Sequence, residues 1–358
     1  MKKNILLSLC FLSLTVSSLN AEERISLEED ENSSKSMATQ IKNHDVKFAL
    51  EFGAQTDFWN PGLTGNVLNY DTEGIFLGFG KFKVKLYDSD VFTIEKYNTL
   101  SSSNTQDDLL AQYKSGKKQE STIDGMKVSL QLMDVLNYIF KKEWLNGLEY
   151  EYDSRDFIGT ATVLQNSLYW YGRTKNAVEG EDYTFLERGN DLSFKTKFTG
   201  HKLSYRFDDV LKKVKGSYVS LGVFDEEWSK PTFVGDSGLN GELPVIFDAN
   251  YYSTGISSAV GIKNSKYNLK AYLDYGVDNE MKIIQKGGNY ESYNNDVDLY
   301  RWGLDADYRF SDVYSNNYLT TDIILGLGMQ YNQIVEDGSI DLDAETLYGV
   351  NAAIEIVF

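Results

Sequence analysis

Apolar and polar residues alternate along much of the chain, and the alternation is clearest at the C-terminus. From Tyr348 to Phe358 every second residue is apolar, whereas the positions between them are mostly polar or small. A period of two is typical of a β-strand with one apolar face. The apolar face of this predicted strand consists of Tyr348, Val350, Ala352, Ile354, Ile356 and Phe358.

The same alternation recurs upstream. In 299–310, for example, Trp302 and Leu304 share one face, while Asp305 and Asp307 occupy the other. Segments of about ten residues with this pattern, separated by turn residues, are those expected of a transmembrane barrel. We expect strands near 46–56, 73–87, 90–98, 122–132, 146–153, 158–172, 190–199, 201–208, 215–226, 250–263, 266–277, 297–310, 317–332 and 345–358.

Two pairs of these segments leave the strand number open. The pairs 146–153 with 158–172, and 190–199 with 201–208, could each be one long bent strand. The count is therefore about 12 or about 14, and both are even, as closed antiparallel barrels usually require. The larger count places the long connection 172–190 at the end of the barrel where short turns are expected. The smaller count removes that conflict.

One segment has a helical period instead. Leu132, Val135, Leu136, Ile139 and Phe140 recur at the spacing of one helix face. We therefore expect one short amphipathic helix that connects two strands and packs against the end of the barrel. A plug inside the lumen is the less favoured alternative.

The N-terminus has the pattern of an export signal. Lys2 and Lys3 precede an apolar run over 5–16, which is too short to span a bilayer as a helix, and small or polar residues follow up to Ala21. We therefore expect a Sec-type signal peptide over 1–21. Residues 22–44 are polar and charged, which predicts a disordered lead-in. Residues 45–358 are expected to form a single barrel.

An export signal combined with a C-terminal strand that ends on Phe358 resembles bacterial outer-membrane β-barrel proteins of the porin-like kind. The resemblance extends over the architecture of 45–358 and carries no functional residues with it. It implies an integral protein of the Gram-negative outer membrane, in contact with membrane lipid and lipopolysaccharide. It also implies that the barrel-assembly machinery recognises the C-terminal strand.

Charge narrows the range of partners. The 35 basic residues less Lys2 and Lys3 leave 33 against 53 acidic ones, a net charge of −20 after signal cleavage. A nucleic-acid-binding protein must neutralise phosphates, so we expect no nucleic-acid partner. The excess of acidic residues is explained by polar loops, which these charges keep solvated.

Few residues of the chain are candidates for catalysis or metal binding. The single cysteine, Cys10, lies in the signal peptide, and His44 and His201 are the two histidines. His201 is expected at a turn with no serine or aspartate motif beside it, so we expect no catalytic residue. The acidic runs 225–227 and 341–343 lack the full ligand spacing of a calcium loop. We therefore expect no enzyme, no metal site and no cofactor.

The face opposite the apolar one carries charges of both signs. Because an unpaired buried charge costs several kcal/mol, such a lumen must hold water or pair its charges. The leading interpretation is a channel for passive diffusion of small hydrophilic solutes or ions. A non-conducting barrel that presents its outer loops is the alternative, and a barrel enzyme acting on lipid or peptide is the third. The expected pore-lining residues are Lys195, Lys197, Lys202, Arg206, Lys270, Asp274, Arg301, Asp305, Asp307, Arg309, Asp322 and Glu355.

Overall fold

The computed structural model describes residues 46–62, 68–70, 74–86, 89–102, 121–140, 147–170, 183–211, 214–234, 245–284, 290–293, 297–316, 318–336 and 344–358. The expected signal peptide and lead-in lie outside these ranges. No helix in the described part of the chain is long and apolar enough to cross a bilayer.

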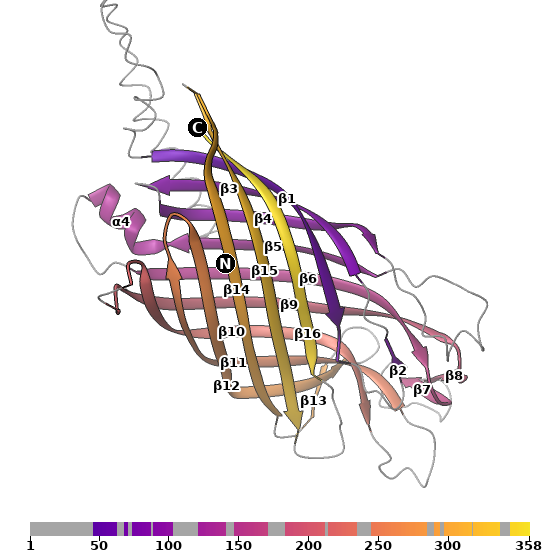
Figure 1. Ribbon diagram of the computed structural model, residues 1–358. Coiled ribbons are helices and arrows are strands. Elements are labelled where there is room, and N and C mark those ends of the chain that lie inside the picture. Colours follow the sequence, from indigo (N-terminus) through magenta and orange to yellow (C-terminus); the bar gives the residue numbers. More distant parts are fainter. Residues whose placement is uncertain are drawn as a thin grey trace, which may run out of the picture.

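Antiparallel strands of the described residues form a closed 12-strand barrel (Figure 1). Each strand pairs with its neighbours in chain order, and β16 pairs with β1 to close the circle. The barrel strands are β1 (Val46–Asn60), β3 (Gly74–Leu86), β4 (Ser89–Ser102), β5 (Thr122–Gln131), β6 (Leu148–Val163), β9 (Asp191–Asp208), β10 (Ser217–Val234), β11 (Val245–Lys263), β12 (Tyr267–Ile284), β14 (Val297–Ser315), β15 (Thr320–Glu336) and β16 (Glu345–Val357).

Four short strands stand outside this circle. They are β2 (Leu68–Asn69), β7 (Ser167–Trp170), β8 (Tyr183–Leu186) and β13 (Tyr290–Tyr293). β2 pairs with β6, β13 pairs with β12, and the β7–β8 hairpin adds to β11 through a parallel pairing. All four lie at the end of the barrel that carries the long connections (Figure 1). We call this the loop end and the opposite one, where β1 begins and β16 finishes, the terminal end.

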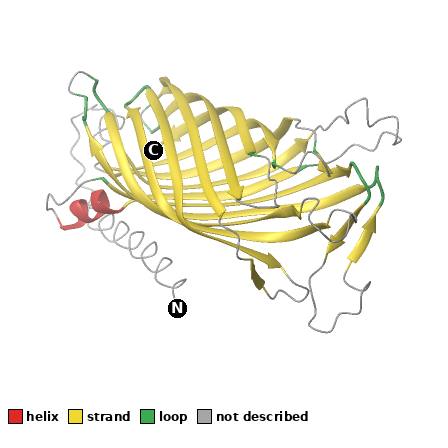
Figure 2. Ribbon diagram, turned by 90° about the horizontal axis from the view of Figure 1, so that it is seen from below, coloured by secondary structure: helices red, strands yellow, loops and turns green. Residues whose placement is uncertain are grey.

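The smaller of the two expected strand counts is correct. β6 spans both segments of one doubtful pair up to Val163, and β9 spans both segments of the other without a break. The connection between β6 and β9 consequently falls at the loop end. The expected helix is also present, as α4 (Leu132–Phe140), and it lies at the terminal end between β5 and β6 (Figure 2).

The outer face of the barrel is apolar between two rings of aromatic side chains. Phe52, Leu221 and Val350 are more than half exposed in this band. Aromatic pairs near the loop end are Phe58–Tyr348, Trp302–Tyr331 and Tyr275–Tyr300; pairs near the terminal end are Phe48–Phe358, Tyr267–Tyr308 and Tyr205–Phe207. An apolar band between aromatic girdles is how a barrel matches the hydrocarbon and headgroup layers of a membrane.

The inner face is buried, and its character changes along the barrel axis. On β3, Ile75, Leu77 and Phe79 face inward near the loop end, whereas Lys81, Lys83 and Lys85 face inward near the terminal end. The inward positions of β11 are instead mostly small. They are Ser253, Gly255, Ser257, Ala259 and Gly261, and side chains of neighbouring strands reach over them.

Candidate functional site

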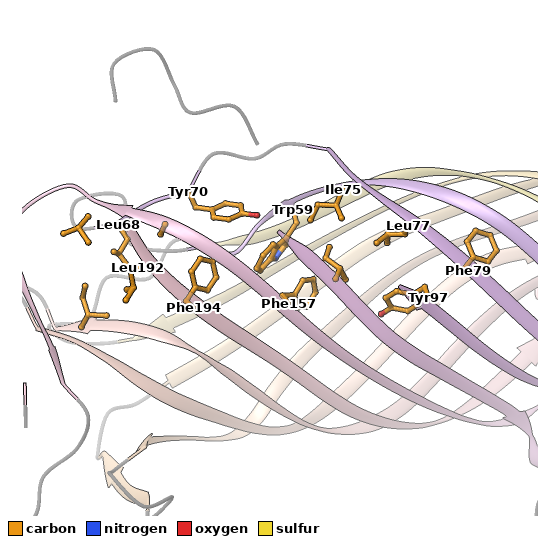
Figure 3. Packing of buried hydrophobic residues seen from close by; sticks show 14 of the residues in the cluster. Trp59, Leu68, Tyr70, Ile75, Leu77, Phe79, Tyr97, Phe157, Leu192 and Phe194 are labelled. Carbon is orange, nitrogen blue, oxygen red and sulfur yellow. The ribbon is translucent and has the colours of Figure 1, made fainter. Parts of the chain in front are cut away.

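Four aromatic side chains cluster in the interior of the barrel near the loop end, and we call them the aromatic layer. Trp59 of β1 stacks on Phe157 of β6 with ring centroids 4.5 Å apart, and Tyr70 and Phe194 complete the cluster (Figure 3). Trp59 is fully buried, and its indole Nε1 donates a hydrogen bond of 3.0 Å to Glu345. Phe157 and Phe194 come from the paired strands β6 and β9, and Trp59 comes from β1, which lies four places from β6 in the circle of strands.

A second contact crosses the lumen closer to the middle. Arg155 Nη2 of β6 donates a hydrogen bond of 3.3 Å to Gln330 of β15, and β6 and β15 lie on opposite sides of the circle of strands. The Arg155 guanidinium also lies 4.6 Å from the centroid of the Phe198 ring and 3.1 Å from the Asp153 carboxylate. Arg155 is therefore held in place from three directions.

Near the terminal end, a network of ion pairs lines one wall from β14 to β4. Glu355 is fully buried and binds three cations, namely Lys83 at 2.7 Å, Lys85 at 3.2 Å and Arg309. Arg309 also binds Asp322 at 2.8 Å. Adjacent strands supply these groups, so the network follows the wall instead of crossing the lumen.

A second network extends from β14 in the other direction, to β9, and does cross part of the interior. Arg301 of β14 binds Asp274 of β12 at 2.6 Å and Glu226 of β10 at 2.5 Å. Lys202 of β9 reaches Asp274 at 3.0 Å. These contacts pass over the small inward residues of β11, which leave room for long side chains to meet above them.

Between the networks lies a cavity of about 370 Å³, which we call the chamber. Its volume falls within the range of about 300–1,000 Å³ typical of small-molecule sites. Charged residues of both signs line it, including Lys127, Asp153, Glu226, Lys270 and Asp305. A chamber with this lining attracts water and polar solutes.

Ten of the twelve expected pore-lining residues face the interior. These are Lys202, Arg206, Lys270, Asp274, Arg301, Asp305, Asp307, Arg309, Asp322 and Glu355. Five of them line the chamber itself, namely Lys202, Lys270, Asp274, Arg301 and Asp305. Arg309, Asp322 and Glu355 belong to the network near the terminal end.

The expectation is wrong for Lys195 and Lys197, which lie on the outer face. Because β9 is one unbroken strand, its even-numbered residues face inward throughout, as the buried Phe194, Thr196 and Phe198 show. Lys195 is 45% exposed and binds the equally exposed Asp156 at 2.9 Å. Both lysines lie nearer the loop end than the apolar band does.

His201 also differs from its expected position. It lies within β9 and not at a turn, and its side chain is on the outer face. The Tyr150 hydroxyl and His201 Nδ1 share a hydrogen bond of 2.8 Å. The acidic run 225–227 is divided by the strand, because Glu226 faces inward while Asp225 and Glu227 face outward.

Several interior residues were not expected from the sequence. The aromatic layer was missed because inward positions were expected to be polar. The inward lysines of β3 were missed although they alternate with Phe82 and Val84, which is a signal that could have identified them. Contacts between opposite strands, such as Arg155–Gln330, leave no trace in local alternation.

No family model matches the chain, and no curated protein matches it. Solved structures do show similarity. The toluene transporter TbuX of Ralstonia pickettii is 11% identical, with 90% of this chain and 92% of that chain covered and a TM-score of 0.32. An outer membrane channel from Pseudomonas putida F1 is 10% identical, with 92% and 100% covered and a TM-score of 0.31.

The β domain of the Bordetella autotransporter BrkA is 8% identical, with 86% of this chain and 99% of that chain covered and a TM-score of 0.33. Similarity at this level carries no functional argument. The chain's own closed circle of strands, with its apolar exterior and ionic interior, carries the structural conclusion. The protein has the architecture of bacterial outer-membrane β-barrel proteins, and no narrower family is indicated.

Proposed function

We propose that the protein is an integral barrel of the outer membrane that acts as a narrow channel for small hydrophilic solutes or ions. The signal peptide expected from the sequence and the apolar band between aromatic girdles support the location. In this orientation the terminal end faces the periplasm and the loop end faces the exterior, because short turns lie on the periplasmic side of such barrels.

The observation that carries the channel proposal is the exposure of charged residues that face inward. Lys127 and Asp305 point into the chamber, yet both are exposed. A charged group that faces the interior of a barrel and is still accessible requires water around it. The chamber is therefore the aqueous part of the pathway, and the aromatic layer is its narrowest part.

Single-channel conductance in planar lipid bilayers tests this proposal. The refolded wild-type protein is expected to give discrete current steps. Trp59→Ala removes the largest ring from the aromatic layer, so we expect its unitary conductance to rise by about twofold or more, because hydrophobic constrictions control conduction. Trp302→Ala, which removes an indole from the outer girdle, is the matched control and should leave the conductance unchanged.

The contacts that cross the lumen favour one second candidate, a barrel that does not conduct and presents its loop end to a partner. Trp59–Phe157 and Arg155–Gln330 both join distant strands and would fix such a scaffold. Bilayers that stay silent for both the wild type and Trp59→Ala, with the protein correctly folded, would favour this candidate over the channel.

A further inference from the structure

Most charges that line the chamber are already bound to one another. Asp153 binds Arg155 at 3.1 Å, Glu151 binds Lys270 at 3.2 Å, and Glu95 binds Lys81 at 3.5 Å. The Arg301 network occupies Asp274, Glu226 and Lys202. Groups held in pairs attract a passing solute weakly, because each charge is compensated at short range.

Three chamber-lining charges in the described part of the chain have no ion-pair partner within 4 Å: Asp57, Lys127 and Asp305. Asp57 is 3% exposed and accepts a hydrogen bond from the Gln55 side chain. The exposed pair, Lys127 and Asp305, is thus what a solute in the chamber meets. The two residues carry opposite charges.

Lys127 and Asp305 also lie on opposite walls. Lys127 is on β5 and Asp305 is on β14, and these strands lie on opposite sides of the circle. No ion pair joins the Lys127 ammonium and the Asp305 carboxylate, which both line the chamber in the described part of the chain. A positive group and a negative group therefore line opposite walls of the chamber, whose volume of about 370 Å³ leaves space for a small solute.

We propose that the chamber selects small zwitterionic solutes, such as an amino acid or a short peptide, through Lys127 and Asp305. The solute carboxylate binds Lys127, and its ammonium group binds Asp305. A neutral solute of the same size gains neither contact, and a solute with one charge gains only one while it meets a like charge opposite. This inference rests on the proposed channel function and names its substrate class.

The chamber offers a second reason for this selectivity. Apart from the buried Asp57, its remaining charged groups are fixed in the pairs described above, so they cannot turn to compensate a net charge brought in by a solute. A zwitterion brings no net charge. Its dipole can align with the line from Lys127 to Asp305, which lowers its energy in the chamber relative to bulk water.

Permeation by glycine and by glycolamide, its neutral isomer, provides the first test. Liposomes that contain the wild-type protein should swell about three- to tenfold faster in glycine than in glycolamide, the ratio expected from two partly exposed ionic contacts. Lys127→Gln and Asp305→Asn should each bring the ratio close to one. Lys195→Gln removes an exposed lysine from the outer face and should keep the wild-type ratio.

A variant in which Lys127 and Asp305 exchange their charges tests whether the two residues bind the solute or only support the fold. In the double variant Lys127→Asp/Asp305→Lys the two walls carry reversed charges, and a zwitterion can bind the other way round. We expect this variant to regain the preference for glycine that each single variant loses. Equal swelling in glycine and glycolamide for the wild type, or no recovery in a folded double variant, would overturn the inference.

Saturation-transfer NMR in detergent micelles distinguishes failure of the inference from failure of the channel. Glycine should show stronger transfer than glycolamide with the wild type, and the difference should vanish in both single variants. If this pattern holds while bilayers stay silent, the binding inference stands and the channel proposal fails. If current steps occur but neither assay separates the isomers, the channel stands and the inference is wrong.

Discussion

At the scale of single residues, Glu355 shows why the interior is both charged and stable. Its carboxylate is fully buried and contacts Lys83, Lys85 and Arg309. Burial of a lone carboxylate would be prohibitive, whereas one bound to several cations has its lone pairs satisfied. Each of the three cations also contacts a second acid, namely Glu51, Asp90 or Asp322, but within the described residues Glu355 alone touches all three.

Glu355→Gln should therefore be strongly destabilising. The amide leaves the three surrounding cations without their shared counterion, so we expect the free energy of unfolding to fall by about 3–5 kcal/mol. Urea unfolding of the protein in lipid vesicles, followed by tryptophan fluorescence, measures the change. Asp156→Asn is the control, because its pair with Lys195 is exposed and should change stability by less than about 1 kcal/mol. Equal losses for both variants would contradict this account.

At the scale of elements, strand continuity decides which way each side chain points. A break near residue 200 would have allowed both the odd-numbered Lys195 and the even-numbered Lys202 to face inward. In the unbroken β9 the two must lie on opposite faces, since a strand alternates strictly. The outer position of Lys195 follows from this alternation.

Cysteine labelling of β9 tests the alternation. The one cysteine of the chain lies in the expected signal peptide, so the mature protein gives no background reaction. In proteoliposomes, Lys197→Cys should react with a bulky charged maleimide, whereas Leu203→Cys, which faces outward within the apolar band, should react only after unfolding in urea. Protection of Lys197→Cys in the folded protein would show that the assigned face is wrong.

The sequence predicted which side chains face inward on strands whose alternation of apolar and polar residues is uniform. It did not predict them on strands whose inward face changes from ionic to aromatic. The outward set of β16 was predicted correctly, because Val350 and Ile354 lie exposed on the outer face and the alternation is unbroken along the strand. On β1 and β6 the inward face changes from ionic to aromatic, as at Glu51 and Trp59. Such a change is the consequence of packing between distant strands, which no local pattern encodes.

At the scale of the whole molecule, the seam between β16 and β1 closes the barrel, and Phe358 contributes to it. The backbone of Phe358 exchanges two hydrogen bonds with Phe48, of 2.9 and 3.0 Å, and their rings lie 6.5 Å apart in the terminal girdle. Phe358 thus extends the seam between β16 and β1 by one position. Its ring is exposed on the outer face of the barrel.

Deletion of Phe358 should lower the yield of folded protein. We expect the fraction that migrates fast on unheated gels to fall several-fold in cells, because both the seam and the recognition strand are shortened. Val357→Ala, an inward-facing change beside it, is the control. A normal yield after spontaneous refolding in detergent, together with a low yield in cells, would assign the effect to assembly; normal yields in both settings would contradict the prediction.

Because the inner face of β11 carries small side chains, the number of strands does not by itself set the width of the lumen. Twelve strands fix the circumference, but the free cross-section depends on how far Lys202 and Arg301 extend over Ser257 and its small neighbours. Shorter residues at those two positions would widen the passage with every backbone pairing intact. Related barrels could therefore change the size of solute they admit by altering a few side chains, with no change to the architecture.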